Sequence, residues 1–396
     1  MPYRDYSLIY NSKSKKTAGK LIMFKLTVSL AAVLLPLNAS AATPSSVDLS
    51  LFNEKAMKTT PETVDCTLEN GDAAQCAKLV LKYQPDDLKT GPYCPDTIED
   101  VGGIWDWDGE KAGLYRIDKA FLQMLDEQGY TFYDQDGNVF SVDNASSPPS
   151  VDHACINVTA DTEVTVTALI PITPVMADES TGLGTVAKVG IALAGAPIFA
   201  DAPSVIDRGH MPALDTCAGH IDPGGWYHYH GTSSDLSTVY THEDVDAECA
   251  NHTQDPAALF GYAFDGIAIY GSTEADGAVP SDLDECSGHV GTLGESDVTA
   301  YHYHASNSFP NLPKCLKGAV AKNNFITTAE VGIGAPRSEN ETPADFNQIA
   351  KTLSVTAVQL IKALRDAGDQ GTDLSSVADA LGISEYALRA ALPNRF

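Results

Sequence analysis

Alternation of apolar and polar residues gives the clearest structural signal in this chain. The segment TEVTVTALIPI, residues 162–172, alternates with a period of two, which is the pattern of a half-buried β-strand. Earlier, the aromatic segments 103–109 and 130–142 each contain an Asp-Gly step, which predicts two hairpins. Their Asp-rich turns lack the other ligands of a calcium-binding EF-hand, so the hairpin interpretation is preferred. A short helix is predicted around Asp72 to Lys82. We therefore expect a mainly β protein with a mixed N-terminal region.

The pattern changes again towards the C-terminus. Residues 321–343 are polar and predict a linker, whereas residues 344–396 are rich in helix-forming residues. This last segment carries a short repeat, with AKTLSVT at 350–356 matched by ADALGIS at 378–384. A pair of packed helical hairpins explains the repeat. Because few basic residues occur there, we expect a small α-helical accessory module that serves packing or a protein partner rather than DNA.

The first 41 residues resemble an export signal. Lys25 precedes the apolar run LTVSLAAVLLPLNASA, and the small-x-small end Ala39-Ser40-Ala41 predicts cleavage before Ala42. The apolar run is too short for a stable membrane anchor. Met23 is the favoured start, with an extended leader over residues 1–22 as the alternative. We expect an exported protein, periplasmic or extracellular, without a membrane anchor.

The chain is strongly acidic. It has 25 Lys and Arg against 53 Asp and Glu, a net charge of −28 at pH 7. Without the predicted signal peptide, 19 of these basic and 52 of these acidic residues remain, a net charge of −33. Such a surface repels a phosphate backbone, so nucleic acid is excluded as a partner, and it attracts divalent cations.

Three blocks of sequence recur in the same order at offsets of 69 to 74 residues. They share the patterns G-x-A-x-x-G-x-x-I, L-D-x-C-x-G-H and Y-H-Y-H, found respectively at 190–198 and 261–269, at 214–220 and 283–289, and at 227–230 and 301–304. Repeated blocks in a fixed order indicate an internal duplication. We expect two related β-rich halves, 184–255 and 256–320, packed about a pseudo-twofold axis.

All eight cysteines follow the predicted cleavage point, and an even count in an exported chain indicates disulfides. The simplest early pairings are Cys66–Cys76 and Cys94–Cys155, although sequence alone leaves connectivity open. Equivalent loops in the two halves favour Cys217–Cys249 and Cys286–Cys315. The alternatives are a Cys217–Cys286 bridge, or these two cysteines as thiolate metal ligands three residues before a histidine.

The Y-H-Y-H tetrapeptides have the spacing of paired metal ligands. In a strand, residues i and i+2 share a face, so His228 and His230 face one way and Tyr227 and Tyr229 the other. Two imidazoles can then converge on a cation while the tyrosines pack into the core. A third histidine follows a glycine upstream in each half, and the two groups could meet across the pseudo-twofold axis. The candidate ligands are His220, His228, His230, His289, His302 and His304. A buried network of His–Tyr hydrogen bonds is the alternative.

The blocks GYAFDGIAIYGS, LDECSGH and YHYHAS are together similar to the YHYH-motif protein family, a group of exported, mostly bacterial proteins without a settled activity. The resemblance covers about residues 161–320. The chain departs from it at Ile267-Ala268, where the family more often has an aromatic residue followed by proline. The predicted organisation is a signal peptide at 1–41, an N-terminal region of unknown role at 42–160, a duplicated YHYH domain at 161–320, a linker at 321–343 and a helical module at 344–396.

These observations favour an exported protein that holds one or two transition-metal ions on histidines. Imidazole ligands suit copper or zinc better than calcium or magnesium, which prefer oxygen. The acidic neighbours predicted to orient the rings are Asp215, Asp222, Asp284 and Glu285.

Two other functions remain open. An open three-histidine site would suit a metal-dependent hydrolase or oxidase, with Asp222 or Glu285 as the base. The chain has no nucleophile elbow, H-E-x-x-H motif or phosphate loop in support of it. The second alternative is a carbohydrate- or protein-binding surface built around Trp226 and Tyr227.

Overall fold

The structure is a computed structural model of the chain. It describes residues 46–143, 153–183, 188–200, 205–232, 255–306, 311–336, 346–356, 359–360, 363–364, 374–384, 387–388 and 391–392. The predicted signal peptide lies outside these residues. Among the described helices, none combines the length and apolar character that a membrane crossing requires.

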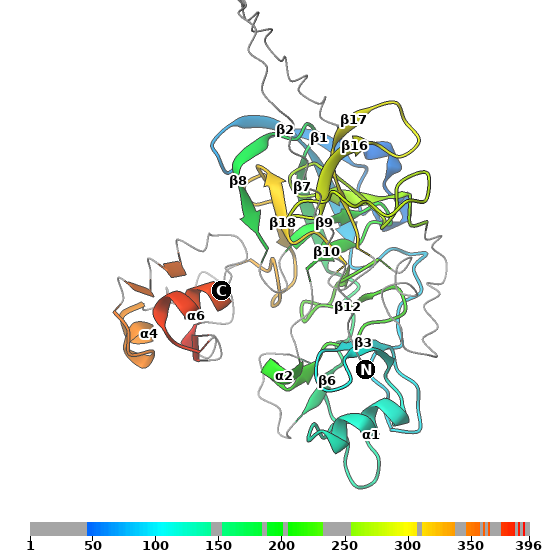
Figure 1. Ribbon diagram of the computed structural model, residues 1–396, viewed down its shortest axis with the longest axis vertical. Helices are drawn as coiled ribbons and strands as arrows, with labels where there is room; N and C mark the ends of the chain where they lie inside the picture. The colour runs from blue at the N-terminus through cyan, green and yellow to red at the C-terminus, as the bar shows by residue number, and fades with distance from the viewer. Residues whose placement is uncertain are drawn as a thin grey trace, which may run out of the picture. The chain divides into compact units, whose positions relative to one another are not determined.

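Strands dominate the described residues, as the alternating pattern predicts, and the largest sheet carries both Y-H-Y-H segments (Figure 1). Its eight strands, in spatial order, are β12 (Gly219–Ile221), β13 (Tyr227–Tyr229), β10 (Pro197–Phe199), β9 (Lys188–Ala192), β14 (Leu259–Ala263), β15 (Ala268–Tyr270), β17 (Thr299–His304) and β16 (Gly288–Thr292).

The order of these eight strands is the same from both edges. β9 and β14 pair antiparallel at the centre. On either side follow an antiparallel neighbour, a parallel strand that carries Y-H-Y-H, and an antiparallel edge strand. This is the arrangement that an internal duplication would produce.

A four-stranded sheet contributes to the same core. Its strands, in order, are β1 (Glu62–Thr67), β2 (Ala73–Lys82), β7 (Thr165–Pro171) and β19 (Phe325–Thr327). Leu79 and Ile170 from this sheet belong to one buried cluster with Ile191, Ile198 and Tyr303 from the larger sheet. The tyrosines of Y-H-Y-H are therefore part of the central hydrophobic core.

The helix predicted at Asp72 to Lys82 is wrong, because this segment forms strand β2. β2 pairs with β1 on one side and β7 on the other. From Ala77 onward its residues alternate between buried and half-buried, with Leu79 and Leu81 completely buried. Burial of one face between two partner strands outweighs the modest helix preference of Ala, Leu and Lys.

Both predicted hairpin turns are found. β3 (Ile104–Trp107) pairs with β4 (Gly113–Arg116) around the first Asp-Gly step. At the second, the Asp134 carboxylate accepts from the Asn138 backbone N–H and an isolated bridge joins Tyr133 to Val139. Helix α1 (Lys119–Glu127), which we did not predict, packs near β3 in a second core cluster (Figure 1).

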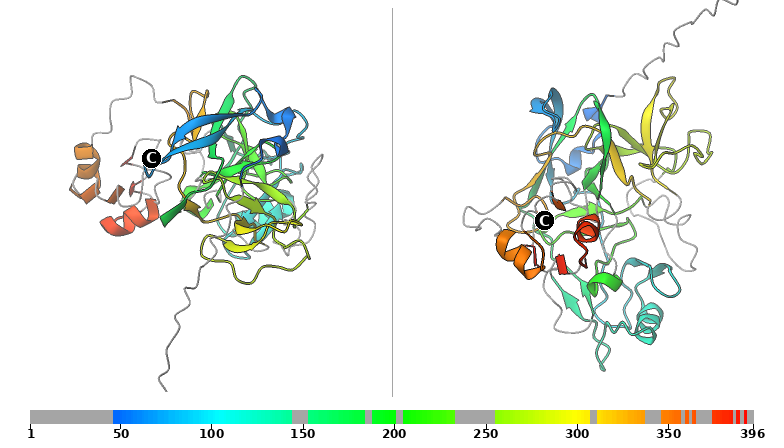
Figure 2. Two further views of the ribbon diagram at one scale, coloured as in Figure 1. Left: turned by 90° about the horizontal axis from the view of Figure 1, so that it is seen from above. Right: turned by 60° about the vertical axis from the view of Figure 1, so that its left-hand side comes forward.

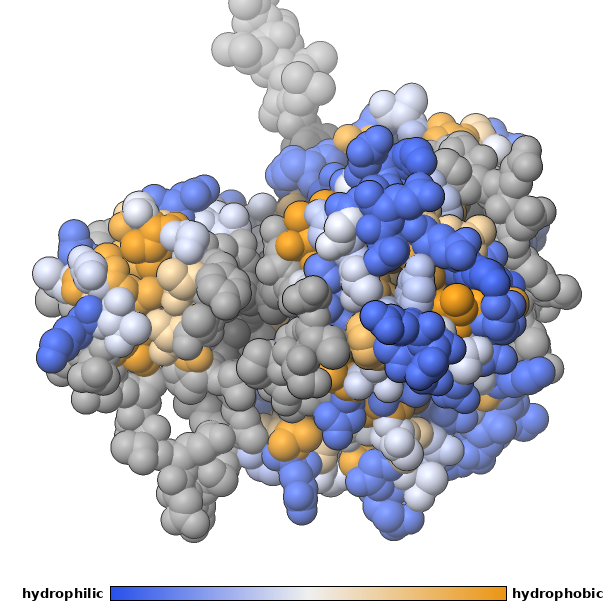
Figure 3. Space-filling view, turned by 90° about the horizontal axis from the view of Figure 1, so that it is seen from below, coloured by the Kyte–Doolittle hydropathy of each residue, from blue (hydrophilic) through white to orange (hydrophobic). Residues whose placement is uncertain are grey.

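The smaller elements complete the β-rich part. They are η1 (Leu49–Leu51), η2 (Glu54–Ala56), β5 (Ser141–Val142), β6 (Ala154–Ile156), β8 (Met176–Gly182), α2 (Val205–Arg208), β11 (His210–Met211) and β18 (Cys315–Gly318). β18 pairs with β8, and β11, β6 and β5 form a three-stranded sheet. On the face shown in Figure 3, hydrophilic residues cover much of the described surface, in keeping with the acidic composition.

The described parts of the C-terminal segment are mainly helical, as predicted. Helices α4 (Phe346–Thr352) and α6 (Leu374–Leu381) are drawn in orange and red in Figure 2. Their apolar residues form a cluster of their own, in which Ile349 and Leu353 join Val377 and Leu388.

Three predicted disulfides are confirmed: Cys66–Cys76, Cys94–Cys155 and Cys286–Cys315. Cys217 is also disulfide-bonded, and Cys249, its predicted partner, lies outside the described residues. The alternative Cys217–Cys286 bridge is wrong because Cys286 pairs with Cys315. The thiolate-ligand alternative is wrong as well, since both cysteines are oxidised.

Candidate metal centres

The predicted histidines form two separate clusters. The first, centre A, consists of His220, His228 and His230. The second, centre B, consists of Glu274, His289, His302 and His304. Four strands lie between β13 and β17, so at about 4.8 Å per strand the centres are on the order of 20 Å apart. The two groups therefore do not meet across a pseudo-twofold axis.

Strand geometry brings each cluster together as the sequence predicted. His220 lies directly opposite His228 in the β12–β13 pair, and His289 lies opposite His302 in the β16–β17 pair. The last histidine of each Y-H-Y-H follows two residues on, on the same face. The tyrosines point to the other face, where Tyr227 packs edge-on against Tyr229 in the buried core.

The L-D-x-C-x-G-H loop positions the third histidine of each centre. Ala218 and Ser287 adopt matching left-handed conformations, with φ of 62° and 63°. The glycine that follows each of them lies against a tyrosine hydroxyl. A Cβ at Gly219 would overlap the Tyr227 hydroxyl, and one at Gly288 would overlap the Tyr301 hydroxyl. The glycines are thus needed for close packing against the tyrosine face.

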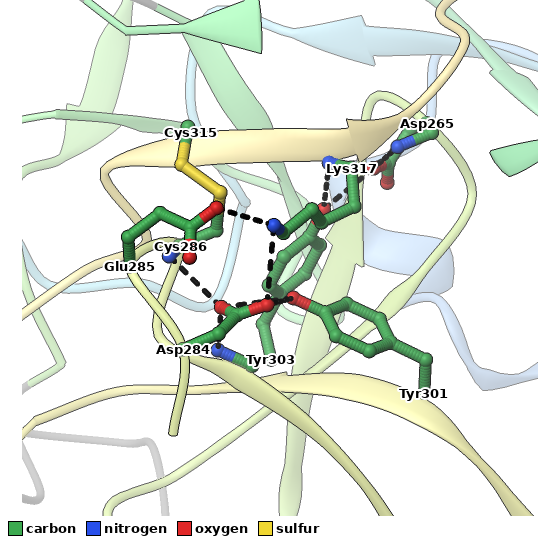
Figure 4. Close-up of polar contacts among 10 residues, drawn as sticks. Asp265, Asp284, Glu285, Cys286, Tyr301, Tyr303, Cys315 and Lys317 are labelled. Carbon is green, nitrogen blue, oxygen red and sulfur yellow. Dashed lines mark hydrogen bonds and ion pairs between the residues drawn. A yellow bond between two sulfur atoms is a disulfide. The ribbon is translucent and has the colours of Figure 1, made fainter. Parts of the chain in front are cut away.

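Asp215 and Asp284 hold these loops rather than the imidazoles. Asp284 accepts from the backbone N–H groups of Cys286 and Gly288 and from the Tyr301 hydroxyl at 3.0 Å (Figure 4). Asp215 makes the matching contacts with Cys217, Gly219 and Tyr227. Our expectation that these carboxylates orient the rings is wrong, because each one is engaged on the tyrosine face.

The other two predicted orienting acids also contact different groups. Asp222 accepts from the Gly224 backbone N–H at 2.7 Å, and burial raises its pKa to about 7. Glu285 forms an ion pair with Lys317, which also lies 3.4 Å from Asp284 (Figure 4). A role for Glu285 as a base at a metal centre has no support in these contacts.

Backbone carbonyls and one unpredicted acid orient the rings instead. The His230 Nδ1 contacts the Ala200 carbonyl, and the His304 Nδ1 contacts the Gly271 carbonyl at 2.7 Å. In centre B, the His302 Nδ1 lies 3.1 Å from the Ala300 carbonyl. The His289 Nδ1 lies 2.8 Å from Asp282 Oδ1.

These contacts determine where the imidazole protons lie. Carbonyl and carboxylate oxygens can only accept hydrogen bonds, so the Nδ1 atom of each ring must carry the N–H. In a neutral ring the Nε2 atom then has a free lone pair. The Nε2 atoms of His302 and His304 in centre B, and that of His230 in centre A, are therefore acceptors. His289 lies between two carboxylates, because its Nδ1 faces Asp282 and its Nε2 faces Glu274.

The acceptor atoms converge at distances that suit a cation. In centre A the three Nε2 atoms are 3.0 to 3.1 Å apart. In centre B, His302 Nε2 is 2.9 Å from His304 Nε2 and 3.3 Å from His289 Nε2. A tetrahedral site with metal–nitrogen bonds of 2.0–2.1 Å places its ligand atoms about 3.3–3.4 Å apart. The clusters thus have nearly the required spacing, and in centre B the lone pairs of His302 and His304 would repel without a cation or an extra proton.

Burial favours the neutral form of five of these rings. Desolvation lowers the pKa of His230 and of His302 to about 4. It also lowers the pKa of His304, and it moves those of His220 and His228 well below the usual value. Because only neutral imidazole binds a metal, the rings are ready to act as ligands at neutral pH.

Glu274 is a candidate ligand that sequence reasoning missed. Its Oε1 lies 3.0 Å from His289 Nε2 and 3.7 Å from His304 Nε2. It begins a tight turn after β15, in which its carbonyl accepts from the Gly277 backbone N–H. This turn has no counterpart among the repeated blocks, so the duplication gave no signal for it.

The fold and the two sites define this chain as a β-rich protein with two clusters of converging histidines. Residues 167–280 match the family model described as YHYH protein. The match includes the first Y-H-Y-H and ends before the second. No curated protein and no solved structure gives a significant match.

Proposed function

We propose that this chain is a metal-binding protein with two separate centres, each holding one transition-metal ion. The supporting observation is the set of Nδ1 contacts in centre B. They commit His302 and His304 to the tautomer whose Nε2 lone pair faces the other ligands, and His289 Nε2 and the Glu274 carboxylate face the same point. A cation between these groups would stabilise the arrangement.

The chemistry of the ligands favours zinc or copper. Imidazole nitrogen is a borderline ligand that suits zinc and copper better than the oxygen-seeking calcium and magnesium. We further propose that the protein works in the periplasm or outside the cell. The three disulfides support this location, since such bonds persist in oxidising compartments.

Metal analysis of the purified chain tests the proposal. Dialysis against excess zinc and then against metal-free buffer should leave two equivalents on the wild type. The double variants His228→Ala/His230→Ala and His302→Ala/His304→Ala should each retain one, because each loses two ligands of a single centre. Each variant is the matched control for the other.

Two further controls use histidines that the duplication does not repeat. His242 and His252 lie outside the described residues and have no counterpart in the other half. Their replacement by alanine should leave both equivalents in place. If these variants lost as much metal as the cluster variants, the assignment of the centres would be wrong. A folded wild type without stoichiometric metal would favour the buried His–Tyr network instead.

A further inference from the structure

The two centres share their histidines but differ in the residues beside them. In centre A the last register pair of β12 and β13 is Ile221 and Tyr227. The next two residues, Asp222 and Trp226, also face each other, because the Asp222 backbone N–H donates to the Trp226 carbonyl at 2.7 Å. In centre B the corresponding register pair is Gly291 and Ala300. These positions are two residues from a ligand histidine, so their side chains lie on the histidine face.

Large side chains enclose centre A. Trp226 is completely buried, and its ring centroid lies 5.0 Å from that of His228. Phe199 packs against the same histidine at 4.9 Å. Asp222 is 3% exposed, and His220, the most exposed of the three ligands, is only 9% exposed. An ion in centre A would be sealed from solvent.

Centre B has an open side. Gly291 has no side chain, and a Cβ built there would lie 2.9 Å from His289 Nε2. Ala300 contributes only a methyl group in the position that Trp226 occupies in centre A. The Glu274 side chain is 26% exposed while its carboxylate contacts the histidine nitrogens. Tyr270 packs against His302 with ring centroids 5.2 Å apart, but no large side chain occupies the two register positions that enclose centre A, and Glu274 carries the ligand set towards solvent.

We propose that centre B exchanges its ion with solvent, whereas centre A retains its ion in a site enclosed by large side chains. This inference depends on the proposed function, because it assumes that both centres bind metal. A chelator must approach the ion before the ion can leave, and Trp226 and Phe199 block that approach in centre A, whereas the Glu274 ligand of centre B is partly exposed. Centre B would bind a divalent transition-metal ion through three nitrogens and the Glu274 carboxylate.

Release of zinc to a coloured chelator tests this directly. The full chain loaded with two equivalents of Zn²⁺ is mixed with excess 4-(2-pyridylazo)resorcinol, and release is followed by absorbance. We expect two phases of one equivalent each, with rates that differ by about tenfold or more. The fast phase should be missing in His302→Ala/His304→Ala and the slow phase in His228→Ala/His230→Ala.

Three single variants sharpen the assignment. Glu274→Gln should weaken zinc binding in centre B by about tenfold or more and leave centre A unchanged. Trp226→Ala should speed release from centre A, and Asp222→Ala provides a second way to open the same wall if the first variant does not fold. The rate for centre B should not change in either of them.

The possible outcomes distinguish a failure of the proposed difference between the centres from a failure of metal binding itself. Two equivalents released at one rate, or a fast phase that belongs to centre A, would overturn the inference and leave metal binding intact. No bound zinc in a folded chain would overturn both.

Discussion

The Nδ1 atoms, which point away from the centre of each histidine cluster, determine which ring nitrogens can bind a metal. The Nδ1 atoms of His230 and His304 donate to main-chain carbonyls, so these rings are fixed in one tautomer and orientation. Ligand geometry is then set by backbone that belongs to neighbouring strands of the sheet. This explains how a two-residue spacing, which alone is weak evidence for a metal, yields a converging set of ligands.

The lowered histidine pKa values predict how the metal-free protein responds to acid. The pKa of His230 is lowered to about 4, so between about pH 4 and 6.5 the unfolded chain binds a proton that the folded chain does not. Stability should therefore fall as the pH drops through this window, by about 3 kcal/mol for this one residue. Urea unfolding of the metal-free wild type and of His230→Gln, at pH 7 and pH 4.5, measures the difference. Equal losses in both proteins would contradict the assigned shift.

Tyr303 and Tyr229 occupy the same position in the two tetrapeptides but differ in their hydroxyl contacts. The Tyr303 hydroxyl donates to buried Asp265 at 2.7 Å and accepts from the Lys317 backbone N–H at 2.7 Å (Figure 4). Tyr303→Phe should cost about 1–3 kcal/mol because it leaves buried polar groups without a partner. Within the described part of the chain the Tyr229 hydroxyl has no hydrogen bond, so Tyr229→Phe is a control that should be nearly neutral in thermal unfolding. A similar loss in both variants would show that the Asp265 contact does not matter.

At the scale of elements, the central strand pair β9–β14 holds the two halves of the large sheet together. A Cβ at Gly190 would overlap the Tyr262 carbonyl, and one at Gly261 would overlap the Ile191 carbonyl. Both are backbone atoms of the facing strand, which cannot move aside as a side chain can. The two glycines therefore allow the close approach of these strands.

Alanine at either glycine should destabilise the protein by about 3 kcal/mol or more, because the strands must separate. Chemical denaturation of Gly190→Ala and Gly261→Ala measures this. Gly182→Ala in β8 is the matched control, since nothing lies within 4 Å of its Cβ position. The account of the central pair would be contradicted if all three variants were equally stable.

Some elements could be predicted from the sequence and others could not. The alternation in residues 162–172 and the Asp-Gly steps act locally, so β7 and the two turns followed from them. β2 was mistaken for a helix because its first residues favour helix. Of its two partner strands, β1 lies just upstream, but β7, which buries its other side, is far downstream in the sequence. Long-range pairing of this kind leaves little trace in a single segment.

The candidate site shows the same division. The six histidines were predictable because strand alternation and the repeated blocks act together on them. Glu274 was not, because its approach to His289 depends on the conformation of a turn after β15. The carbonyls of Ala200 and Gly271 were not predictable either, since a main-chain acceptor is present at every residue. Asp282, which contacts the Nδ1 atom of His289, lies seven residues before that histidine, and this spacing is not part of the Y-H-Y-H pattern.

For the molecule as a whole, the disulfides and export remain to be tested together. Protein recovered from an oxidising compartment should have four disulfides, no free thiol and an N-terminus at Ala42. Non-reducing peptide mapping should find Cys217 joined to Cys249, because Cys217 is oxidised and the other described cysteines are paired among themselves. A peptide in which Cys249 is a free thiol would contradict this.

Anomalous X-ray diffraction from zinc-loaded crystals, recorded on both sides of the zinc absorption edge, tests the central claim most directly. The account predicts two strong anomalous peaks, one among His220, His228 and His230 and one among Glu274, His289, His302 and His304, on the order of 20 Å apart. Peaks at other residues, or two histidine clusters without anomalous density in crystals grown with excess zinc, would contradict it.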